Sequence, residues 1–397
     1  MNKNKLINWQ PERSKYPEID ADGNPIVDLS SHKFTKIWHG PNHPGVTGNM
    51  SLELTLSGDE IVEAKTHVGY LHRGFEKLME RRLYIQCFPT CIRICVPEAD
   101  SNEYSLAACI EDLANIEVSE AALWHRTLVM EMARLQVLLR TVPGQASTLS
   151  LGLGGQWGMY LRELILDRFE ELTGGRIYHM YIIPGGVRGL IPSGFKQRME
   201  ENLKLIDEFV LKIEDLIFNN AIFKKRTVGV GVIDPTWVDK FGIVGPNARA
   251  AGFARDIRKD YPYLKYNELD FDVFTLKDSD VYSRSLIRKQ DLITTVDLIR
   301  QILAKIPEKG EIRAKTPNVL HWKIPKGETY QRSESSRGEF GMYLVSDGSE
   351  YPRRVNVRGP SYAHAVSLLE KLLINANVAD VHNIMVSLQT CPPEIER

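Results

Sequence analysis

The sequence predicts a mostly helical α+β protein, and three observations carry this prediction. Apolar residues recur at helical spacing over much of the body at about 69–306. Alternating apolar and polar residues predict a β-hairpin at about 50–66, and strand- and turn-like sequence fills a β region at about 310–360. No linker-like change of composition and no internal repeat divides the chain. We therefore expect one helical body with two small β appendages.

The predicted hairpin lies in MSLELTLSGDEIVEAKTHVG, where two alternating strands flank the turn Ser57-Gly58-Asp59. From Gly69 the period changes to that of a helix. GYLHRGFEKLMERRLYIQ carries an apolar face at helical spacing, so we expect one helix here, which ends before Pro89.

Further helices are expected on both sides of this region. Two of them fill about 101–141, with Ser101 and Ser119 as N-caps. Another runs through LGLGGQWGMYLRELILDRFEELTGG and stops at its last two glycines. The remaining predicted helices are 195–224, 279–306 and about 361–377, the last leading into a short tail within the C-terminal segment 361–397.

Composition excludes several function classes. Fifty basic and 51 acidic residues give a net charge of -1, which argues against a nucleic-acid partner. No run of about 18 apolar residues is present, so no membrane span is expected. The polar arm at residues 1–36 lacks the apolar segment of a signal peptide and is interpreted as an interface. We expect a cytoplasmic chain unless a partner holds it against a membrane.

Three of the five cysteines lie at intervals of four in CFPTCIRICVPEAD, residues 87–100. An odd number of cysteines without an export signal argues against a structural disulfide framework. Three interpretations stay open for this cluster: a metal site, a redox dithiol, or small apolar residues in a core. Cys109 lies among apolar residues and is interpreted as a core residue.

Cys91 and Cys95 are the two thiols of this cluster that one helical turn can bring together. Pro89 and Pro97 interrupt a regular helix through all three cysteines, whereas no proline separates Cys91 from Cys95. Such a pair can act as a thiol–disulfide couple, and Arg93 between them can favour the thiolate.

The closing SLQTCPPEIER holds the fifth cysteine. Two prolines follow Cys391, which excludes a position inside a helix and predicts a rigid extended turn. Glu394 and Arg397 are three residues apart and can form a pair, and a frayed terminus is the alternative. His43 lies in a Pro/Gly loop, where a ring is either solvated or placed for function.

Several segments resemble successive signatures of one superfamily. It comprises the 49-kDa-type subunit of respiratory complex I and the large subunit of membrane-bound nickel–iron hydrogenases. The matching segments are GPNHPGVTG, GYLHRGFEKLMERRLYIQ, NEYSLA, YIIPGGVRG, SSRGEFGMYLVSDGS and SLQTCPPEIER. The resemblance implies that residues 37–397 form a hydrogenase large-subunit-like domain with a central helix bundle.

The resemblance to complex I fails at the quinone site. Complex I subunits carry the loop G-P-x-H-P-x-x-H-G, whose second histidine contacts the quinone headgroup. Here His43 matches the first histidine, and Thr47 stands in place of the second. Val96 stands where complex I has its quinone-binding tyrosine. Loss of both hydrogen-bonding groups argues against quinone reduction, which is kept as the alternative function.

The resemblance to hydrogenases fails at the metal site. Hydrogenases hold nickel and iron with two Cys-x-x-Cys pairs. Cys95 and Cys391 match the first cysteine of each pair, while Glu98 and Glu394 replace the second. The resemblance therefore implies that no nickel–iron centre forms. A single iron or zinc ion bound by these four residues is the alternative.

The extra thiol Cys91 resembles a third branch, the archaeal complex-I-like assemblies that reduce sulfane sulfur with electrons from ferredoxin. This resemblance implies a catalytic subunit of a membrane-bound oxidoreductase that reduces polysulfide or organic polysulfide and couples this reaction to ion pumping. The non-enzymatic alternative is a structural docking subunit without chemistry of its own.

The same resemblance implies roles for the candidate residues. We expect Cys91 and Cys95 to attack the sulfur chain, with Arg93 stabilising the thiolate. Arg337, in SSRGEFG, matches a family arginine that lines the cavity and is expected to bind an anionic polysulfide. Cys391 is expected across the cavity. The expected proton donors are Glu98, Glu394 and His43.

The resemblance also implies partners. The chain is expected to bind no cofactor itself, and 4Fe–4S clusters are expected in partner subunits, with Arg73 of the HRG motif near one of them. The expected partners are a small iron–sulfur subunit like the 20-kDa subunit of complex I, a 30-kDa-like subunit, a membrane-arm subunit, ferredoxin as electron donor and a sulfur substrate. The complex would hold this chain on the cytoplasmic side of the cell membrane.

Overall fold

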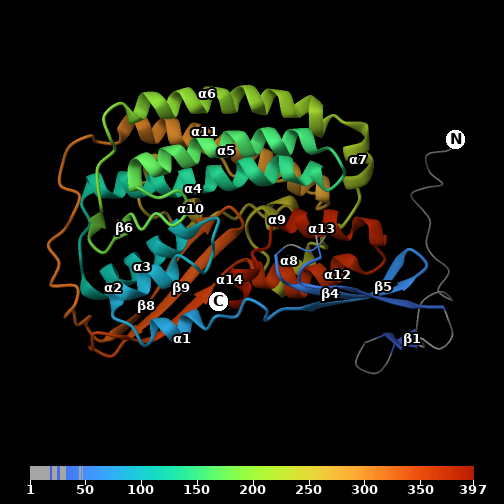
Figure 1. Ribbon diagram of the computed structural model, residues 1–397, viewed down its shortest axis with the longest axis horizontal. Helices are drawn as coiled ribbons and strands as arrows, with labels where there is room; N and C mark the ends of the chain where they lie inside the picture. Colours follow the sequence, from blue (N-terminus) through green and yellow to red (C-terminus); the bar gives the residue numbers. More distant parts are fainter. Residues whose placement is uncertain (1–17, 20–24, 27–32, 44–45, 47) are drawn as a thin grey trace.

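The structure is a computed structural model that describes residues 18–19, 25–26, 33–43, 46 and 48–397. Long helices form a stack in the upper part of the molecule, and small sheets lie below it and at one end (Figure 1). The predicted mostly helical α+β fold is confirmed. Most of the predicted N-terminal arm, and Thr47, lie outside the described residues.

Four long helices build the stack. They are α4 (Glu120–Ser147), α5 (Gly152–Thr173), α6 (Phe195–Ile213) and α11 (Val281–Lys305). α4 packs against both α5 and α11, and α6 covers α5 and α11 on the far side (Figure 1). The predicted N-cap Ser119 is confirmed, because its Oγ accepts a hydrogen bond from the N–H of Ala122.

The helix predicted at 69–86 is wrong. The segment forms two short helices instead, α1 (Phe75–Met79) and α2 (Tyr84–Cys91). Gly69 and Gly74 have left-handed φ values of 125° and 63°, so the helix cannot start at Gly69. Pro89 lies inside α2 rather than beyond its end.

The predicted N-cap Ser101 is also wrong. α3 (Ala99–Ala114) begins two residues after Pro97, and Glu98 takes the N-cap position. The helix predicted at 195–224 is broken as well, because α6 passes into a π-helical segment, Glu214–Phe218, before α7 (Ala221–Thr227).

The predicted hairpin is present and gains a third strand. β3 (Thr35–His39), β4 (Ser51–Ser57) and β5 (Glu60–His67) form an antiparallel sheet in the order β3-β4-β5. Two-residue strands form two further small pairs. They are β1 (Glu18–Ile19) with β2 (Pro25–Ile26), and β6 (Ile182–Ile183) with β7 (Gly186–Val187).

A second three-stranded sheet lies beneath α3 (Figure 1). Its antiparallel strands are β8 (Gly327–Ser335), β9 (Gly338–Ser346) and β10 (Pro352–Arg358), in the order β10-β9-β8. Ser336 and Arg337 form the tight turn between β8 and β9. Gly338 after this turn has a φ of 129°, and a Cβ there would lie 2.7 Å from Val244, so only glycine fits.

The C-terminal segment is more folded than the predicted helix and short tail. It contains a π-helical segment, Ala363–Leu368, followed by α12 (Leu369–Leu373), α13 (Val381–Leu388) and α14 (Pro392–Glu396). Asn375 and Gln389 adopt left-handed φ values of 66° and 55° and end the helices before them. The predicted extended conformation of Cys391 is confirmed, with φ -119° and ψ 98°.

Shorter helices connect these parts. They are α8 (Thr236–Phe241), α9 (Gly245–Ala250), α10 (Ile257–Asp260), and the 3-10 segments Tyr266–Glu268 and Val378–Asp380. One apolar core fills the helical stack and reaches the β8–β9 hairpin. A second core packs the N-terminal sheet, including Leu52 and Leu54, against Leu369 and Leu388 of the C-terminal helices. Because Leu388 and Ile395 belong to this second core, the C-terminal segment lies in the interior of the protein.

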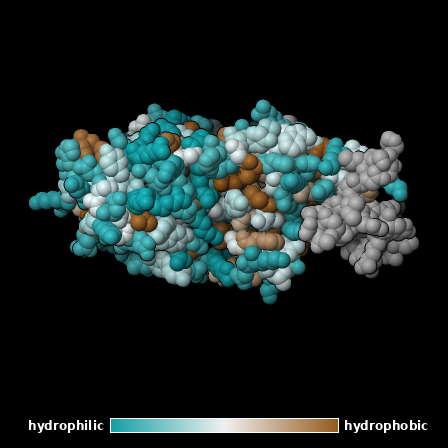
Figure 2. Space-filling model, turned by 90° about the horizontal axis from the view of Figure 1, so that it is seen from below, coloured by the Kyte–Doolittle hydropathy of each residue, from teal (hydrophilic) through white to brown (hydrophobic). Residues whose placement is uncertain are grey.

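The lower face of the molecule is largely polar, and apolar side chains gather near its middle (Figure 2). In the part of the chain that the structure describes, none of the helices combines the length and apolar character that a bilayer crossing requires.

The close approach of α4 and α5 gives a stability prediction. A Cβ at Gly158 would lie 2.3 Å from the carbonyl oxygen of Leu139 and 2.5 Å from the Pro143 ring. We expect Gly158→Ala to lower the free energy of unfolding by about 1–3 kcal/mol, because it overpacks the contact. Urea unfolding followed by circular dichroism measures the change.

Gly144→Ala is the matched control, because Gly144 also lies inside α4 and a Cβ there meets nothing within 4 Å. We expect it to be neutral or to raise the free energy of unfolding by up to about 1 kcal/mol. Equal destabilisation by both substitutions would contradict the close α4–α5 contact.

Candidate functional site

Two cysteines from distant parts of the chain meet in the interior. Cys95 lies in the short link between α2 and α3, and Cys391 precedes α14. Their sulfur atoms and a carboxylate oxygen of Glu394 lie within 4.8 Å of one another. All three residues are buried, and both thiols are free. The structure thus brings together three of the residues singled out from the sequence, which we call the Cys95–Cys391–Glu394 cluster.

Arg337 connects this cluster to Glu98. Its Nη1 lies 3.4 Å from the Cys95 Sγ and 2.8 Å from the Glu98 Oε2. The N–H and the hydroxyl of Ser336 both donate to the Glu98 carboxylate at 2.7 Å. Glu98 therefore holds the β8–β9 turn in place, and the turn aims a buried guanidinium at Cys95.

Glu394 is held by a different set of groups. Its Oε1 accepts a hydrogen bond from the N–H of Ser361 at 2.9 Å, and the Ser361 hydroxyl accepts one from the N–H of Cys391 at 3.1 Å. A Cβ at Gly359 would lie 2.4 Å from the Glu394 carboxyl group, so a glycine makes room for this carboxyl. Burial raises the pKa of Glu394, which favours its protonated form.

The two thiols of the cluster are electrostatically unequal. A hydrogen bond from Cys95 lowers the pKa of Cys391, and the positive charge of Arg337 lowers it further. The same hydrogen bond, together with burial, raises the pKa of Cys95 well above its ordinary value. Of the two thiols, Cys391 is therefore the one that loses its proton more readily, and Cys95 is the one that keeps it.

The predicted pairing of Cys91 with Cys95 is not the one that the structure shows. The Cys91 thiol donates to the carbonyl oxygen of Asn102 at 3.2 Å and packs in the apolar core with Cys87 and Cys109. Helix α2 ends at Cys91, so the helical i, i+4 spacing does not extend to Cys95. Burial raises the pKa of Cys91 well above its ordinary value, which disfavours the thiolate. The described structure therefore pairs Cys95 with Cys391.

The predicted role of Arg93 is not supported by its contacts. Its guanidinium donates to the carbonyl oxygen of Pro89 at 2.6 Å and lies 4.7 Å from the centre of the Tyr178 ring. The guanidinium that contacts Cys95 belongs to Arg337. The interpretation of Cys109 as a core residue is confirmed, and Cys87 is buried in the same core.

Arg73 lies on the outer side of the same region. It is exposed, its Nη2 donates to the carbonyl oxygen of Arg93 at 2.9 Å, and its guanidinium lies 4.0 Å from the centre of the Phe75 ring. Burial lowers its pKa, and the charges of Tyr178 and Cys391 oppose this effect. Arg73 therefore stands between the surface and the cluster.

The two remaining candidates have partners of other kinds. The ring of His43 stacks on that of His39 with a centroid distance of 4.2 Å, and its backbone N–H donates to the carbonyl oxygen of Gly40. The predicted ion pair of Arg397 with Glu394 is wrong, because Arg397 donates to Glu76 of α1 at 3.0 Å.

Sequence reasoning missed three residues of the site. Ser336 binds Glu98, Ser361 binds both Glu394 and the backbone of Cys391, and Gly359 leaves room for the Glu394 carboxyl. Ser336 and Arg337 are neighbours in SSRGEFG, which could have pointed to Ser336. No local sequence signal marks Ser361 or Gly359, because their roles depend on contacts across the fold.

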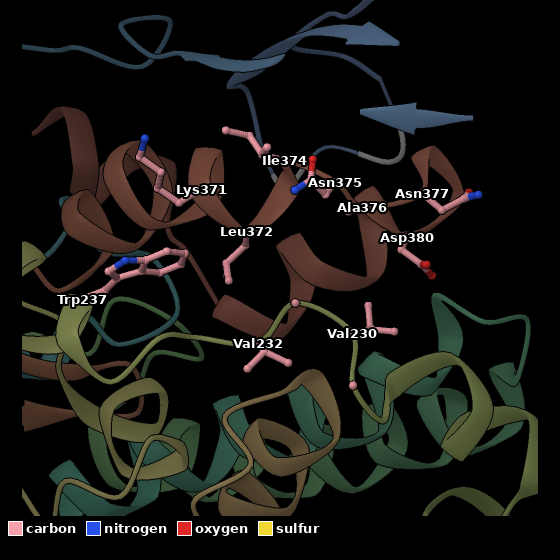
Figure 3. A pocket seen from close by; sticks show the side chains of 12 residues that line it. Val230, Val232, Trp237, Lys371, Leu372, Ile374, Asn375, Ala376, Asn377 and Asp380 are labelled. Carbon is pink, nitrogen blue, oxygen red and sulfur yellow. The ribbon is translucent and has the colours of Figure 1, made fainter. Parts of the chain in front are cut away.

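Figure 3 shows a surface pocket with a different set of lining residues. It has a volume of about 560 Å³ and lies between the loop 229–232 and the segment 371–377. Trp237 and Lys371 stand near one end and Asp380 near the other. Among the described residues that line this pocket, none belongs to the Cys95–Cys391–Glu394 cluster.

Comparison with known proteins places the chain in a family. The family "Respiratory-chain NADH dehydrogenase, 49 Kd subunit" matches residues 154–323 and 320–397. An NADH-quinone oxidoreductase subunit of Thermosipho melanesiensis is 40% identical over 366 residues, which cover 91% of this chain and 99% of that protein. The chain belongs to this family.

Two further relatives extend the comparison. An F(420)H(2) dehydrogenase subunit of Methanosarcina mazei is 36% identical over 375 residues, with 90% of this chain and 96% of that protein covered. A chain in the solved structure of the membrane-bound sulfane sulfur reductase, an archaeal respiratory membrane complex, superimposes with a TM-score of 0.89. It is 40% identical, and the match covers 92% of this chain and 99% of that one.

The position of Arg337 gives a prediction about Cys391. In Arg337→Gln we expect the pKa of Cys391 to rise by about one unit or more, because the thiolate loses a positive charge that lowers this pKa. The thiolate fraction is measured by its ultraviolet absorbance as a function of pH, with Cys391→Ser as the baseline.

Two variants sharpen this measurement. Arg337→Lys keeps the charge and should keep most of the shift, whereas Arg93→Gln removes a guanidinium that faces Pro89 and Tyr178 and should leave the titration unchanged. A larger effect from Arg93→Gln than from Arg337→Gln would contradict the assignment of Arg337 as the partner of the thiol pair.

Proposed function

We propose that the protein is the catalytic large subunit of a complex-I-like, membrane-bound oxidoreductase that reduces sulfane sulfur, and that Cys95 and Cys391 are its reactive thiols. The observation that carries this proposal is the buried, proton-sharing thiol pair beside Arg337. The similarity to a chain of the membrane-bound sulfane sulfur reductase supports the choice of substrate. This proposal replaces the Cys91/Cys95 dithiol with Cys95/Cys391.

The reaction begins with the thiolate of Cys391. It attacks a sulfur atom of the S–S chain, a Cys391–sulfur bond forms, and the rest of the chain leaves as a thiolate or hydrosulfide that takes up one proton. Cys95, after losing its proton, attacks the Cys391 sulfur and releases the bound sulfur as hydrosulfide, so a Cys95–Cys391 disulfide forms. Two electrons and two protons then restore both thiols.

Neighbouring residues would assist these steps. Arg337 contacts Cys95, and its charge favours the Cys391 thiolate and would bind an anionic polysulfide. Burial favours a protonated Glu394 next to Cys391, so this carboxyl is suited to donate a proton to the leaving sulfur. Glu98 positions Arg337, and His43 stays a candidate for proton exchange with solvent.

The electrons would come from ferredoxin through a 4Fe–4S cluster in a small partner subunit, with no cofactor bound by this chain. Arg73 supports this arrangement, because it is exposed and its charge lies close enough to interact with Cys391. We further propose a 30-kDa-like partner, a membrane-arm subunit that couples the reaction to ion pumping, and a peripheral position on the cytoplasmic side of the membrane.

Cysteine variants of the assembled complex test this function. We expect Cys95→Ser and Cys391→Ser each to lower viologen-linked polysulfide reduction at least about 100-fold, because each removes one thiol of the couple. Cys91→Ala is the control, since Cys91 packs in the core, and it should keep activity within about threefold once the complex is assembled.

Three outcomes of this experiment would contradict the proposal. Full activity in both Cys95→Ser and Cys391→Ser would exclude the thiol mechanism. If the variants assemble poorly but each assembled complex turns over at the normal rate, the result would favour a structural docking subunit. Reduction of a quinone with no reduction of polysulfide would favour the function that the name of the Thermosipho relative describes.

A single iron or zinc ion is the second candidate for this site. The observation that favours it is the spacing of Cys95, Cys391 and Glu394, whose ligand atoms lie within 4.8 Å of one another. Two thiolates and a carboxylate suit zinc or iron, and Glu98 is occupied by Arg337 and Ser336.

Elemental analysis separates the two candidates. Our main proposal predicts that the purified chain binds less than about one-tenth of a metal ion per molecule after dialysis against iron or zinc and a weak competing chelator. About one ion per chain, lost in Cys391→Ser and kept in Cys91→Ala, would contradict it and support the metal site.

A further inference from the structure

A buried carboxyl group lies next to the turn that carries Arg337. Glu334 is the second-last residue of β8, and its side chain is 4% exposed. Its backbone N–H donates to the hydroxyl oxygen of Tyr263 at 3.0 Å, and its carbonyl oxygen accepts a hydrogen bond from Arg134 at 2.6 Å. Side chains from elsewhere in the fold therefore hold the strand just before Ser336 and Arg337.

The carboxyl group of Glu334 has few partners of its own. Its Oε2 accepts the N–H of Ile257, the first residue of α10, at 3.2 Å, and its Oε1 has no hydrogen-bond partner among the described residues. In the β8–β9 pairing Glu334 lies directly opposite Glu339, and both residues line the same pocket. Two carboxylates in such a position repel each other.

The acids next to Glu334 already have arginine partners. Three buried arginines face three buried acids in ion pairs of 2.7 to 3.7 Å. α10 contacts β8, and its Arg258 reaches Glu131 of α4, so the network connects α10 to α4 beside the hairpin. The members are Arg134 and Glu131 of α4, Arg249 of α9, Asp256 and Arg258 at α10, and Asp291 of α11.

An ionised Glu334 would add a buried carboxylate to which none of these three arginines donates a hydrogen bond among the described contacts. Burial of an uncompensated charge is strongly unfavourable, whereas a protonated carboxyl keeps the network neutral. The other titratable groups that face this region are Tyr263 and Tyr266 behind it and Arg288 of α11 beside Arg249 and Asp291. Arg255, Asp260, Arg332 and Glu339 lie around the pocket.

We propose that Glu334 works as a protonated carboxyl that positions the Ser336–Arg337 turn, and that loss of this proton switches the thiol site off at alkaline pH. This inference rests on the proposed function and names a pH control of the same site. Glu334 is connected to Arg337 through its neighbour Ser335. The hydroxyl oxygen of Ser335 accepts a hydrogen bond from the N–H of Arg337 at 3.2 Å, and the same hydroxyl donates to the carbonyl oxygen of Gly338 at 2.8 Å.

The mechanism of the switch lies in Arg134. Its Nη2 donates to the Glu334 carbonyl oxygen, while its Nη1 is buried without a hydrogen-bond partner among the described residues. A carboxylate on Glu334 would attract this guanidinium and draw it away from the carbonyl oxygen, which loosens the end of β8. Arg337 would then lose its fixed position beside Cys95.

The direction of the pH effect follows from the environment of Glu334. Burial, and then the negative charge of Asp256, raise the pKa of Glu334 to about 8. Below this pH the carboxyl is protonated and the network is neutral. In the unfolded chain the carboxyl titrates near its ordinary value, so the stability that it contributes is largest in acid and decreases until the pH reaches about 8.

Infrared spectroscopy of the whole chain tests the inference directly. We expect a carbonyl band of a protonated carboxyl that is present at pH 7, disappears with a midpoint near pH 8, and is absent in Glu334→Gln. Glu339→Gln is the matched control from the same pocket and the paired strand, and it should keep the band. A Glu334 band that disappears near pH 4 to 5 would overturn the inference.

The pH dependence of activity in the assembled complex is the second test of the inference. Polysulfide reduction should fall about tenfold between pH 7 and pH 9 in the wild type and in Glu339→Gln, as the protonated fraction falls. Glu334→Gln has the shape of the protonated form and should stay within about twofold over this range.

The infrared and activity measurements together distinguish failure of the Glu334 inference from failure of the proposed sulfane sulfur reduction. An unchanged alkaline loss in Glu334→Gln would overturn the positioning role. The infrared band does not depend on the reaction, so a band with the expected midpoint in a complex that reduces no polysulfide at any pH would contradict the proposed function alone.

Discussion

The buried ion pair of Arg337 with Glu98 holds the site together. Glu98 belongs to the link before α3, Arg337 to the β8–β9 turn, and the same guanidinium faces Cys95 and the charge of Cys391. Three parts of the chain therefore meet at one side chain. A buried pair of this kind contributes little net stability, but removal of either partner leaves an uncompensated charge in the interior. The role of this ion pair is to fix the position of the Arg337 guanidinium beside Cys95.

The two Cys-x-x-Glu segments look equivalent in the sequence and differ physically. Glu98 binds a guanidinium, whereas Glu394 binds a backbone N–H, and burial raises its pKa. The pKa of Cys95 is raised and that of Cys391 is lowered, so Cys391 loses its proton more readily. One segment thus supplies a thiol and the carboxylate that holds Arg337, and the other supplies a thiol of lowered pKa with a buried carboxyl beside it. This asymmetry suits the stepwise breaking of an S–S bond better than symmetric metal binding.

Much of the fold could be predicted from local pattern. The hairpin at β4–β5, the N-cap Ser119 and the extended Cys391 follow from alternation, capping and proline chemistry. The predicted pairing of Cys91 with Cys95 assumed that helical spacing continues past Cys91, whereas α2 ends at that residue. The contact of Cys95 with Cys391 depends on the second core, which brings the chain end inside. No local pattern encodes such a contact, so Ser361 and Gly359 were missed for the same reason.

The most direct test of the account asks which two sulfur atoms become joined. The chain is oxidised with a small excess of polysulfide, remaining thiols are blocked, and the disulfide-linked peptides are identified by mass spectrometry. We predict a peptide pair that links Cys95 to Cys391, with Cys91 recovered as a blocked thiol after unfolding. A Cys91–Cys95 disulfide, or recovery of Cys95 and Cys391 as free thiols, would contradict the central claim that these two residues form the reactive couple.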